Sequence, residues 1–216
     1  MMKNQKNNLL WLRTPKCGST TIRTLFAKHE WGKRQGPKHN NVYTSETKTR
    51  FGIISHGLND EFIMNHREFY DSSYKFAVIR NPFERAVSSY IDSKNRRPGR
   101  VKGGIRPKAW FDGSFENFVF MPFEKMSHQA ALHSRPLMSH YIKSVNIDQF
   151  VRFENLEEEI SHLFKKYLLV DIKLPLPHQH KGNHKHYTEY YNDKIRQEVA
   201  RKYKQDIDAF GYEFGE

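Results

Sequence analysis

The sequence predicts an α/β protein of three layers, α/β/α, built on a central parallel sheet. Short apolar runs alternate along the chain with segments whose apolar residues recur at helical spacing. This alternation is typical of parallel sheets with helices on both faces. A length of 216 residues suits one domain with a sizeable core, so residues 1–216 are expected to form a single domain. Ligands of such sheets bind at the carboxyl ends of the strands.

The first half of the chain contains three expected strands. Residues 9–12 form the first, and a helix follows from Ser19 after a tight loop. Residues 51–55 form the second strand, and residues 59–69 form the helix after it. The third strand, residues 75–79, leads directly into a polar segment.

That polar segment has the residues of a helix start. Asn81 suits the N-cap and Pro82 the first helical position. Glu84 stands third, where its carboxylate can reach back toward the helix start. Apolar residues at helical spacing between 83 and 91 then predict the buried stripe of this helix.

The second half of the chain continues the alternation. Residues 93–113 are rich in Arg, Lys, Gly and Pro and are expected to form a basic loop, with helical segments between 114 and 142. A fourth strand is expected at 147–153 and a helix at 155–168. The last helix is expected from about Asn192.

The composition indicates the kind of binding partner and the cellular compartment. Lys and Arg total 36 against 24 acidic residues, which gives a net charge of +12 and indicates a polyanionic partner. No stretch approaches the roughly 20 apolar residues of a membrane span, and the first residues lack the apolar stretch of a signal peptide. The single cysteine, Cys17, excludes an internal disulfide. A reducing compartment, and therefore a cytoplasmic location, is expected.

The loop after the first strand has the chemistry of an anion site. Residues 14–21 join a buried strand to a helix, whose first amides and dipole attract an anion. Ser19, Thr20 and Thr21 add hydroxyl donors, and Lys16 adds a charge. The alternative is that Ser19 only caps the helix. The lysine precedes the glycine, which distinguishes this loop from the nucleotide-triphosphate loop GxxxxGK[ST].

Two segments together resemble the sulfotransferases that use 3′-phosphoadenosine 5′-phosphosulfate (PAPS) as donor. Residues 15–21, Pro-Lys-Cys-Gly-Ser-Thr-Thr, resemble their 5′-phosphosulfate loop, and residues 80–90 resemble their 3′-phosphate segment. Residues 152–156, 174–178 and 187–212 resemble the carbohydrate branch, particularly its compact bacterial-type members. The resemblance spans nearly the whole chain. It implies a P-loop NTPase-like fold and transfer of a sulfuryl group from PAPS to an acceptor hydroxyl. No metal ion is expected, because the sulfuryl group carries little charge compared with a phosphoryl group and a lysine can neutralise the leaving group.

The resemblance also implies a role for individual residues. Lys16 matches the lysine that contacts the bridging oxygen and stabilises the leaving product, 3′-phosphoadenosine 5′-phosphate (PAP). Arg80 and Ser88 match the pair that holds the 3′-phosphate, although an ion pair of Arg80 with a nearby carboxylate is the alternative. The residues expected to contact the 5′-phosphate are Cys17, Gly18, Ser19, Thr20 and Thr21.

Three further residues are expected near the donor. Phe153 stands where the family often has an aromatic ring against the adenine, but a core position at the end of a strand is the alternative. Lys181 and Lys185 lie in a loop that could close over the donor.

Sulfuryl transfer also needs a base that takes the proton of the acceptor hydroxyl. His56 is the best candidate because it ends the second strand, and an imidazole with an ordinary pKa near 6.5 suits proton abstraction at neutral pH. Related glycan sulfotransferases resemble this chain in having a histidine there. The alternative is that His56 caps the helix that starts near Asn59. Glu84 and His39 are weaker candidates for the base.

Two other basic segments have more than one interpretation. His178, His180, His184 and His186 form an HxH…HxH pattern, but the lysines between them repel a cation, so a basic lid is favoured over a metal site. The stretch 96–108 suits either a groove for an acidic glycan or a solvated loop.

Two rival functions remain open. A P-loop kinase or nucleotide hydrolase needs a lysine after the glycine and an acidic residue at a strand end for magnesium, and neither is evident. A non-catalytic binder of nucleic acid or heparin fits the charge, but no RNA motif or recognition-helix pattern supports it. The interpretation as a sulfotransferase accounts for both segments and the charge, with a carbohydrate hydroxyl, possibly on an anionic glycan, as the expected acceptor.

Overall fold

The computed structural model of the chain describes residues 8–28, 34–35, 42–44, 50–54, 59–95, 100–101, 104–105, 111, 113–169, 171–176 and 185–216. The chain divides into two compact units, each assembled from two stretches of sequence. Unit 1 comprises Met1–Ile79 with Ser139–Lys181, and unit 2 comprises Arg80–Met138 with Gly182–Glu216. The described part of the chain contains no helix that is both long and apolar enough to cross a membrane.

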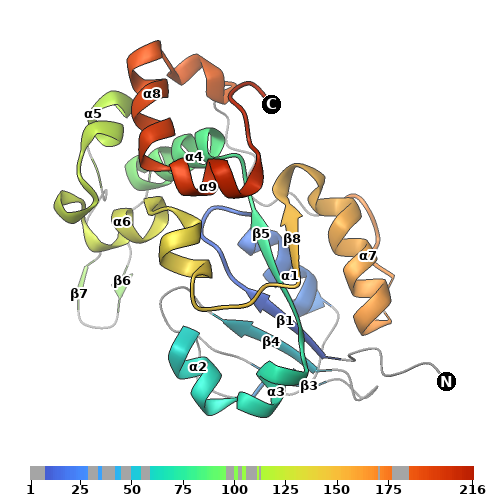
Figure 1. Cartoon of the computed structure of the whole chain (residues 1–216). Helices are drawn as coiled ribbons and strands as arrows, with labels where there is room; N and C mark the ends of the chain where they lie inside the picture. Colours follow the sequence, from blue (N-terminus) through green and yellow to red (C-terminus); the bar gives the residue numbers. More distant parts are fainter. Residues whose placement is uncertain are drawn as a thin grey trace. The chain divides into compact units, whose positions relative to one another are not determined.

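Unit 1 is built on a six-stranded sheet of order β2-β3-β4-β1-β5-β8 (Figure 1). Its strands are β1 (Asn8–Leu12), β2 (Arg34–Gln35), β3 (Val42–Thr44), β4 (Arg50–Ile54), β5 (Tyr74–Ile79) and β8 (Gln149–Arg152). The four predicted strands are confirmed and run parallel to one another. The short antiparallel pair β2–β3 extends the edge beside β4 and was not predicted.

The central strands of this sheet are buried along nearly their whole length. Leu9, Leu10, Trp11 and Leu12 of β1 are all buried, as are the last five residues of β5. Such continuous burial is expected of strands covered on both faces. The continuous apolar runs of the sequence therefore reflect the three-layer arrangement directly.

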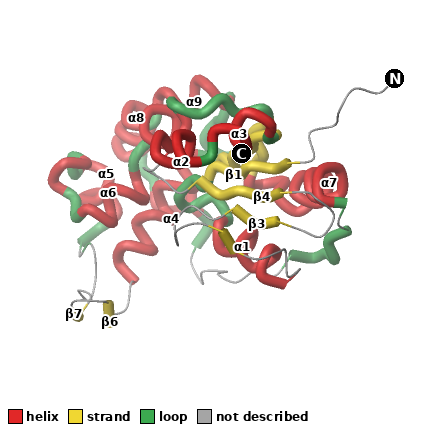
Figure 2. Tube along the Cα trace, turned by 90° about the horizontal axis from the view of Figure 1, so that it is seen from below, coloured by secondary structure: helices red, strands yellow, loops and turns green. Residues whose placement is uncertain are grey.

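The helices of unit 1 cover both faces of the sheet. They are α1 (Ser19–Lys28), α2 (Asn59–Asn65), α3 (Arg67–Ser72) and α7 (Leu156–Leu168). The chain moves from β1 to β4 on one side and then from β4 to β5 on the other, so right-handed connections place α1 and the pair α2–α3 on opposite faces. Figure 2 shows this arrangement. The predicted three-layer α/β/α fold, of the P-loop type, is confirmed.

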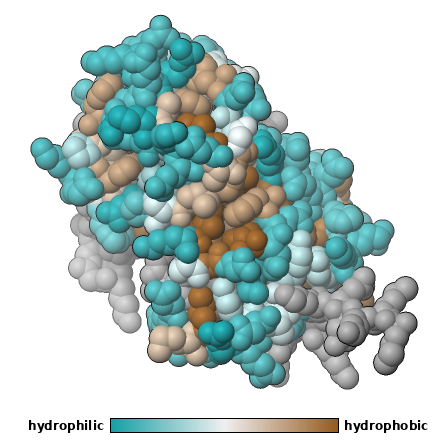
Figure 3. Space-filling model, in the orientation of Figure 1, coloured by the Kyte–Doolittle hydropathy of each residue, from teal (hydrophilic) through white to brown (hydrophobic). Residues whose placement is uncertain are grey.

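Unit 2 is mostly helical. It contains α4 (Pro82–Asn95), α5 (Phe115–Phe120), α6 (His128–Ser134), α8 (Asp193–Lys202) and α9 (Lys204–Phe210), with short 3₁₀ turns at Phe123–Lys125 and Tyr187–Tyr190 and two short strands, β6 (Arg100–Val101) and β7 (Gly104–Ile105). Aromatic side chains dominate its core, with Phe83, Tyr90, Phe115 and Phe118 packed together. The surface over α8 is largely hydrophilic (Figure 3).

Several predicted boundaries need correction. The first three residues of the expected basic loop belong to α4, and β6 and β7 lie within the rest of it. The predicted helix 59–69 is two helices that meet at His66, whose φ of −136° is not helical. The last helix is likewise two, and it breaks at Tyr203, where φ is −108°. The predicted fourth strand is shorter, because a 3₁₀ turn at Phe153–Asn155 ends it and leads into α7.

Candidate functional site

The residues predicted to bind the donor are divided between the two units. Lys16 to Thr21 and Phe153 lie in unit 1, and Arg80, Ser88 and Lys185 lie in unit 2. His56, His39 and Lys181 fall outside the residues that the structure describes, as do most of the basic stretch 96–108 and the histidines of the 178–184 segment. The predicted 5′-phosphate loop and the predicted 3′-phosphate segment therefore belong to separate compact units.

The loop between β1 and α1 has the backbone of an anion-binding turn. Lys16 has φ +64° and Gly18 has φ +72°, so two left-handed residues flank Cys17 just before the first turn of α1. Alternation of left- and right-handed residues turns successive amides toward one side, where they form a concave nest for an anion. The first turn of α1 carries no acidic side chain. The dipole of the ten-residue helix α1 adds to the attraction for negative charge.

The left-handed Lys16 is notable because it has a side chain. Left-handed backbone costs an L-residue roughly 1–2 kcal/mol, and such costs are found mainly where function requires the geometry. The Lys16 side chain is half-buried. The loop thus holds a lysine in a conformation that a glycine would adopt more easily.

Two contacts fix this loop within unit 1. The hydroxyl of Thr14 donates to the carbonyl oxygen of Val78 in the neighbouring strand β5. The thiol of Cys17 is fully buried and donates to the carbonyl oxygen of Pro15 at 3.3 Å. The side chain of Cys17, a residue predicted to contact the 5′-phosphate, is therefore directed into the loop's own backbone.

Gly18 is packed against the turn that follows β8. A Cβ atom added at Gly18 would lie 2.9 Å from Cδ2 of Leu156 and 3.2 Å from the ring of Phe153. Only glycine fits at this position, since its left-handed φ and the lack of space both exclude a side chain. The contact also places Phe153, which is half-buried, beside the loop. No sequence signal pairs positions 18 and 153, because the contact is set by the sheet.

Arg13, which ends the approach to this loop, is half-buried. Burial, and secondarily the neighbouring Arg23, lower the pKa of the Arg13 guanidinium to about 10. A lowered pKa means that the surroundings of Arg13 disfavour its charged form.

The segment after β5 has the helix start that the sequence predicts. The Asn81 side-chain oxygen accepts from the amide of Phe83 at 3.0 Å, and its amide nitrogen donates to the carbonyl oxygen of Glu213 at 2.8 Å. The Asn81 side chain is thus held at both ends, which fixes the backbone that carries Arg80.

Arg80 forms the ion pair that the sequence left open as an alternative. Its Nε and Nη2 donate to the two carboxylate oxygens of Glu84 at 3.0 and 2.7 Å. Glu84 reaches back as predicted, but to the guanidinium of Arg80. An Arg at i and a carboxylate at i+4 is a pairing that sequence spacing can indicate. A guanidinium has five N–H groups, so a fork already oriented by one carboxylate can still donate to a phosphate.

Ser88 lies on the same side of α4 as Glu84. Both are half-buried, whereas the residues between them, Arg85, Ala86 and Val87, are buried. Ser88 thus stands beside the apolar stripe of the helix, as the sequence pattern indicates. Lys185 is exposed, with Nζ at 3.8 Å from a carboxylate oxygen of Glu189.

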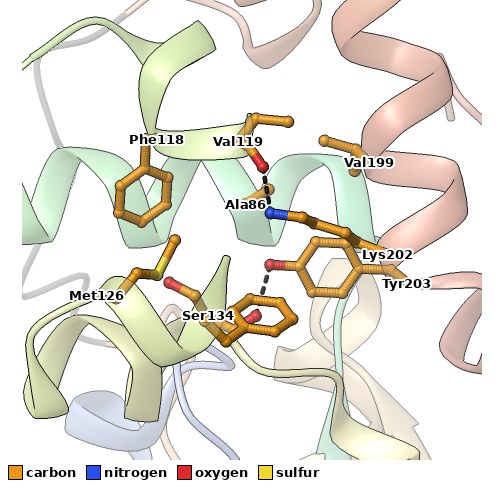
Figure 4. A pocket seen from close by; sticks show the side chains of 9 residues that line it. Ala86, Phe118, Val119, Met126, Ser134, Val199, Lys202 and Tyr203 are labelled. Atoms are coloured by element: carbon orange, nitrogen blue, oxygen red, sulfur yellow. Dashed lines mark hydrogen bonds between the residues drawn. The ribbon is translucent and has the colours of Figure 1, made fainter. Parts of the chain in front are cut away.

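A small cavity in unit 2 does not suit a nucleotide. It measures about 10 Å³ and is lined mainly by apolar side chains together with Ser134, Lys202 and Tyr203 (Figure 4). This is room for about one water molecule. Lys202 Nζ donates to the carbonyl oxygens of Val119 and Met121, and burial lowers the pKa of this ammonium group. The cavity therefore belongs to the packing of the unit.

Within the described ranges, no group of three or more His, Cys, Asp or Glu side chains is placed to hold a metal ion. The histidine pattern of residues 178–184 lies outside these ranges, so its predicted role as a lid stays a prediction.

The chain matches a known protein family over nearly its whole length. Residues 1–213 match the sequence model described as the sulfotransferase family. A search of curated proteins finds no match for this chain. The match covers both units and nearly the whole chain.

Proposed function

This chain belongs to the sulfotransferase family, and we propose that it transfers a sulfuryl group from PAPS to a hydroxyl of a carbohydrate. The transferred group is the sulfuryl of the donor's phosphosulfate, and the product that leaves is PAP. The proposal extends to a single catalytic domain over residues 1–216, a cytoplasmic location and a reaction without a metal ion.

The observation that carries the proposal is the conformation of the loop after β1. Left-handed Lys16 and Gly18 precede the start of α1, and Gly18 is closed in by Leu156 and Phe153. The nest of amides and the helix dipole suit the 5′-phosphate of the donor. The hydroxyls of Ser19, Thr20 and Thr21, which are exposed or half-buried in the first turn, supply further donors.

Lys16 would act on the leaving group. As the bond between sulfur and the bridging oxygen breaks, that oxygen keeps the electron pair and gains negative charge. An ammonium group at the bridging oxygen stabilises the charge where it develops, which lowers the barrier for the chemical step. This role would account for a lysine at a left-handed position.

Arg80 and Ser88 would hold the 3′-phosphate of the donor. The guanidinium offers a forked charged donor, and the serine hydroxyl offers a second donor two turns along the same helix. Glu84 keeps the fork oriented before the donor binds. Phe153 would serve mainly to shape the loop through Gly18, with contact to the adenine as a second role.

His56 would be the general base. It takes the proton of the acceptor hydroxyl as the acceptor oxygen forms its bond to sulfur, in line with the bond that breaks. A neutral imidazole is the form needed, and it predominates above pH of about 6.5. Lys181 and Lys185 would add positive charge over the bound donor.

The acceptor proposed is a carbohydrate, with an anionic glycan favoured by the net charge of +12. The test is transfer of radiolabelled sulfuryl from PAPS to a panel of neutral and acidic oligosaccharides, with separation of the labelled products. Label should appear on at least one sugar with the wild type and be lost with Lys16→Met, which keeps the length of the side chain without its charge. Label on no sugar, together with label on a non-sugar hydroxyl such as a phenol, would replace the carbohydrate acceptor but leave the transfer reaction in place.

A further inference from the structure

An Asp–His pair lies one helical turn beyond Ser88. Arg80, Glu84, Ser88 and Asp92 recur at intervals of four along α4 and its start, and all four are half-buried. The interval places them on one side of the helix. This line of polar side chains stands beside the buried stripe, and its far end meets the last turn of α6.

The partner of Asp92 is His133. Nδ1 of the imidazole lies 3.0 Å from Oδ2 of Asp92, and the His133 and Asp92 side chains are 14% and 22% exposed. Because a carboxylate only accepts, Nδ1 carries the proton in this pair. A carboxylate on one ring nitrogen fixes the orientation of the imidazole and makes the other nitrogen, Nε2, more basic.

His133 is held firmly in its place. Its carbonyl oxygen accepts from the hydroxyl of Ser89 at 2.8 Å, and the carbonyl oxygen of Arg135 accepts from Nη2 of Arg85 at 3.0 Å. The hydroxyl of Tyr203 donates to the carbonyl oxygen of Ser134 between them. Three successive carbonyls at the end of α6 are thus tied to buried side chains. The histidine also stands in the last turn of α6, where the helix dipole favours a positive imidazolium.

We propose that the Asp92–His133 pair is a further contact for the 3′-phosphate of the donor, with Nε2–H of the imidazolium donating to a phosphate oxygen beside Ser88. The inference rests on the proposed function, and it adds to the predicted 3′-phosphate pair a third residue from another helix. Asp92 acts as a positioning residue, because it contacts the imidazole and not the donor. The hydrogen bonds from Ser89 and Arg85 of α4 to the end of α6 keep the His133 imidazole beside Asp92, one helical turn from Ser88.

A comparison of two ligands separates this role from a structural one. PAP and adenosine 5′-phosphate differ only in the 3′-phosphate, so calorimetric titration of both into each variant isolates contacts to that group. His133→Gln should bind PAP roughly tenfold to a hundredfold more weakly, the range of a lost charge-assisted hydrogen bond, with adenosine 5′-phosphate unchanged. Asp92→Asn should show a smaller loss with the same selectivity. His128→Gln, an exposed residue at the start of the same helix, is the matched control and should match the wild type.

The outcomes are distinguishable. The inference would be overturned if His133→Gln and Asp92→Asn each lost the same affinity for PAP as for adenosine 5′-phosphate, or lost affinity for neither. The pair would then only hold α4 and α6 together. If His133→Gln does not fold, Asp92→Asn decides in the same way. A wild type that binds PAP no better than adenosine 5′-phosphate would overturn the proposed 3′-phosphate site itself, and the inference with it.

Discussion

The guanidinium of Arg80 and the carboxylate of Glu84, four residues later, are joined by two hydrogen bonds of 3.0 and 2.7 Å. The Arg80 side chain is 11% exposed in this pair, whereas Arg67 and Arg201, which also pair with carboxylates, are each 70% exposed. The attraction within an ion pair that is partly withdrawn from solvent is screened less by water and salt, and its geometry is better fixed. Arg80 is therefore a pre-oriented cation at the start of α4.

The first prediction concerns this pair. Arg80→Lys keeps the charge but loses the fork, so it cannot hold Glu84 with two bonds and also donate to a phosphate. PAP affinity should fall at least about tenfold, measured by calorimetric titration. Arg67→Lys is the matched control, because Arg67 pairs with Asp71 at the same spacing on the exposed surface of α3. Unchanged affinity in Arg80→Lys would mean that charge alone suffices at this position.

The second prediction concerns Lys16. Replacement by glycine removes the cost of a left-handed side-chain residue, so Lys16→Gly should be as stable as the wild type or more stable, by up to about 1 kcal/mol. The same variant should lose roughly 10²–10³ in kcat, because the leaving oxygen is no longer stabilised. Urea unfolding and donor turnover measure the two effects. A variant that loses stability and activity together would contradict the assignment of Lys16 to the chemical step.

The third prediction separates backbone strain from crowding at Gly18. Gly211 also has a left-handed φ, +65°, but a Cβ added there meets nothing within 4 Å. Gly211→Ala should therefore cost about 1 kcal/mol of stability from backbone conformation alone. Gly18→Ala should cost clearly more, because its Cβ meets Leu156 and Phe153, and it should also weaken donor binding.

Truncation of Leu156, which would clash with a side chain at position 18, gives the control for that prediction. In the double variant Gly18→Ala/Leu156→Ala the 2.9 Å contact is absent. Part of the donor affinity lost in Gly18→Ala should return, although the buried Leu156 is itself costly to truncate. If the double variant binds the donor as weakly as Gly18→Ala alone, the loss of donor affinity comes from the changed loop conformation and not from the clash with Leu156.

The fourth prediction concerns a buried charge pair in unit 2. The Asp206 carboxylate accepts from the amides of Leu137 and Met138 at 2.8 and 2.9 Å and lies 3.4 Å from Nη2 of Arg85, and the Asp206 and Arg85 side chains are each 1% exposed. Asp206→Asn leaves the Arg85 charge buried without its partner and should cost roughly 3–5 kcal/mol in urea unfolding. Asp208→Asn removes an exposed pair with Lys204 and should change stability by less than about 0.5 kcal/mol. Equal effects of the two substitutions would contradict the importance of the buried pair.

The sequence predicts the layers of this fold well, and the reasons are local. The apolar run of β1 has no alternation because both faces of that strand are covered, and Asn81 and Pro82 have the chemistry of a helix start whatever surrounds them. The edge strands β2 and β3 escape prediction because two or three residues carry no pattern. The breaks at His66 and Tyr203 are equally invisible, since both residues fit the helical pattern around them.

The candidate site is predictable only where its residues are neighbours in the sequence. The loop at residues 15–21 and the segment from Arg80 to Ser88 are each one strand end followed by one helix. The contact of Phe153 with Gly18 and the pair of Asp92 with His133 join residues that are 135 and 41 positions apart. Such contacts depend on sheet order and helix packing, which a single sequence does not reveal.

The assignment of PAPS as the donor is tested by calorimetric titration of PAP into the wild type, without added metal, beside Arg80→Ala. We expect binding with a Kd on the order of micromolar for the wild type and a loss of at least about a hundredfold in Arg80→Ala. Folded wild type that does not bind PAP, but binds ATP with magnesium or only long polyanions, would contradict the assignment of PAPS as the donor.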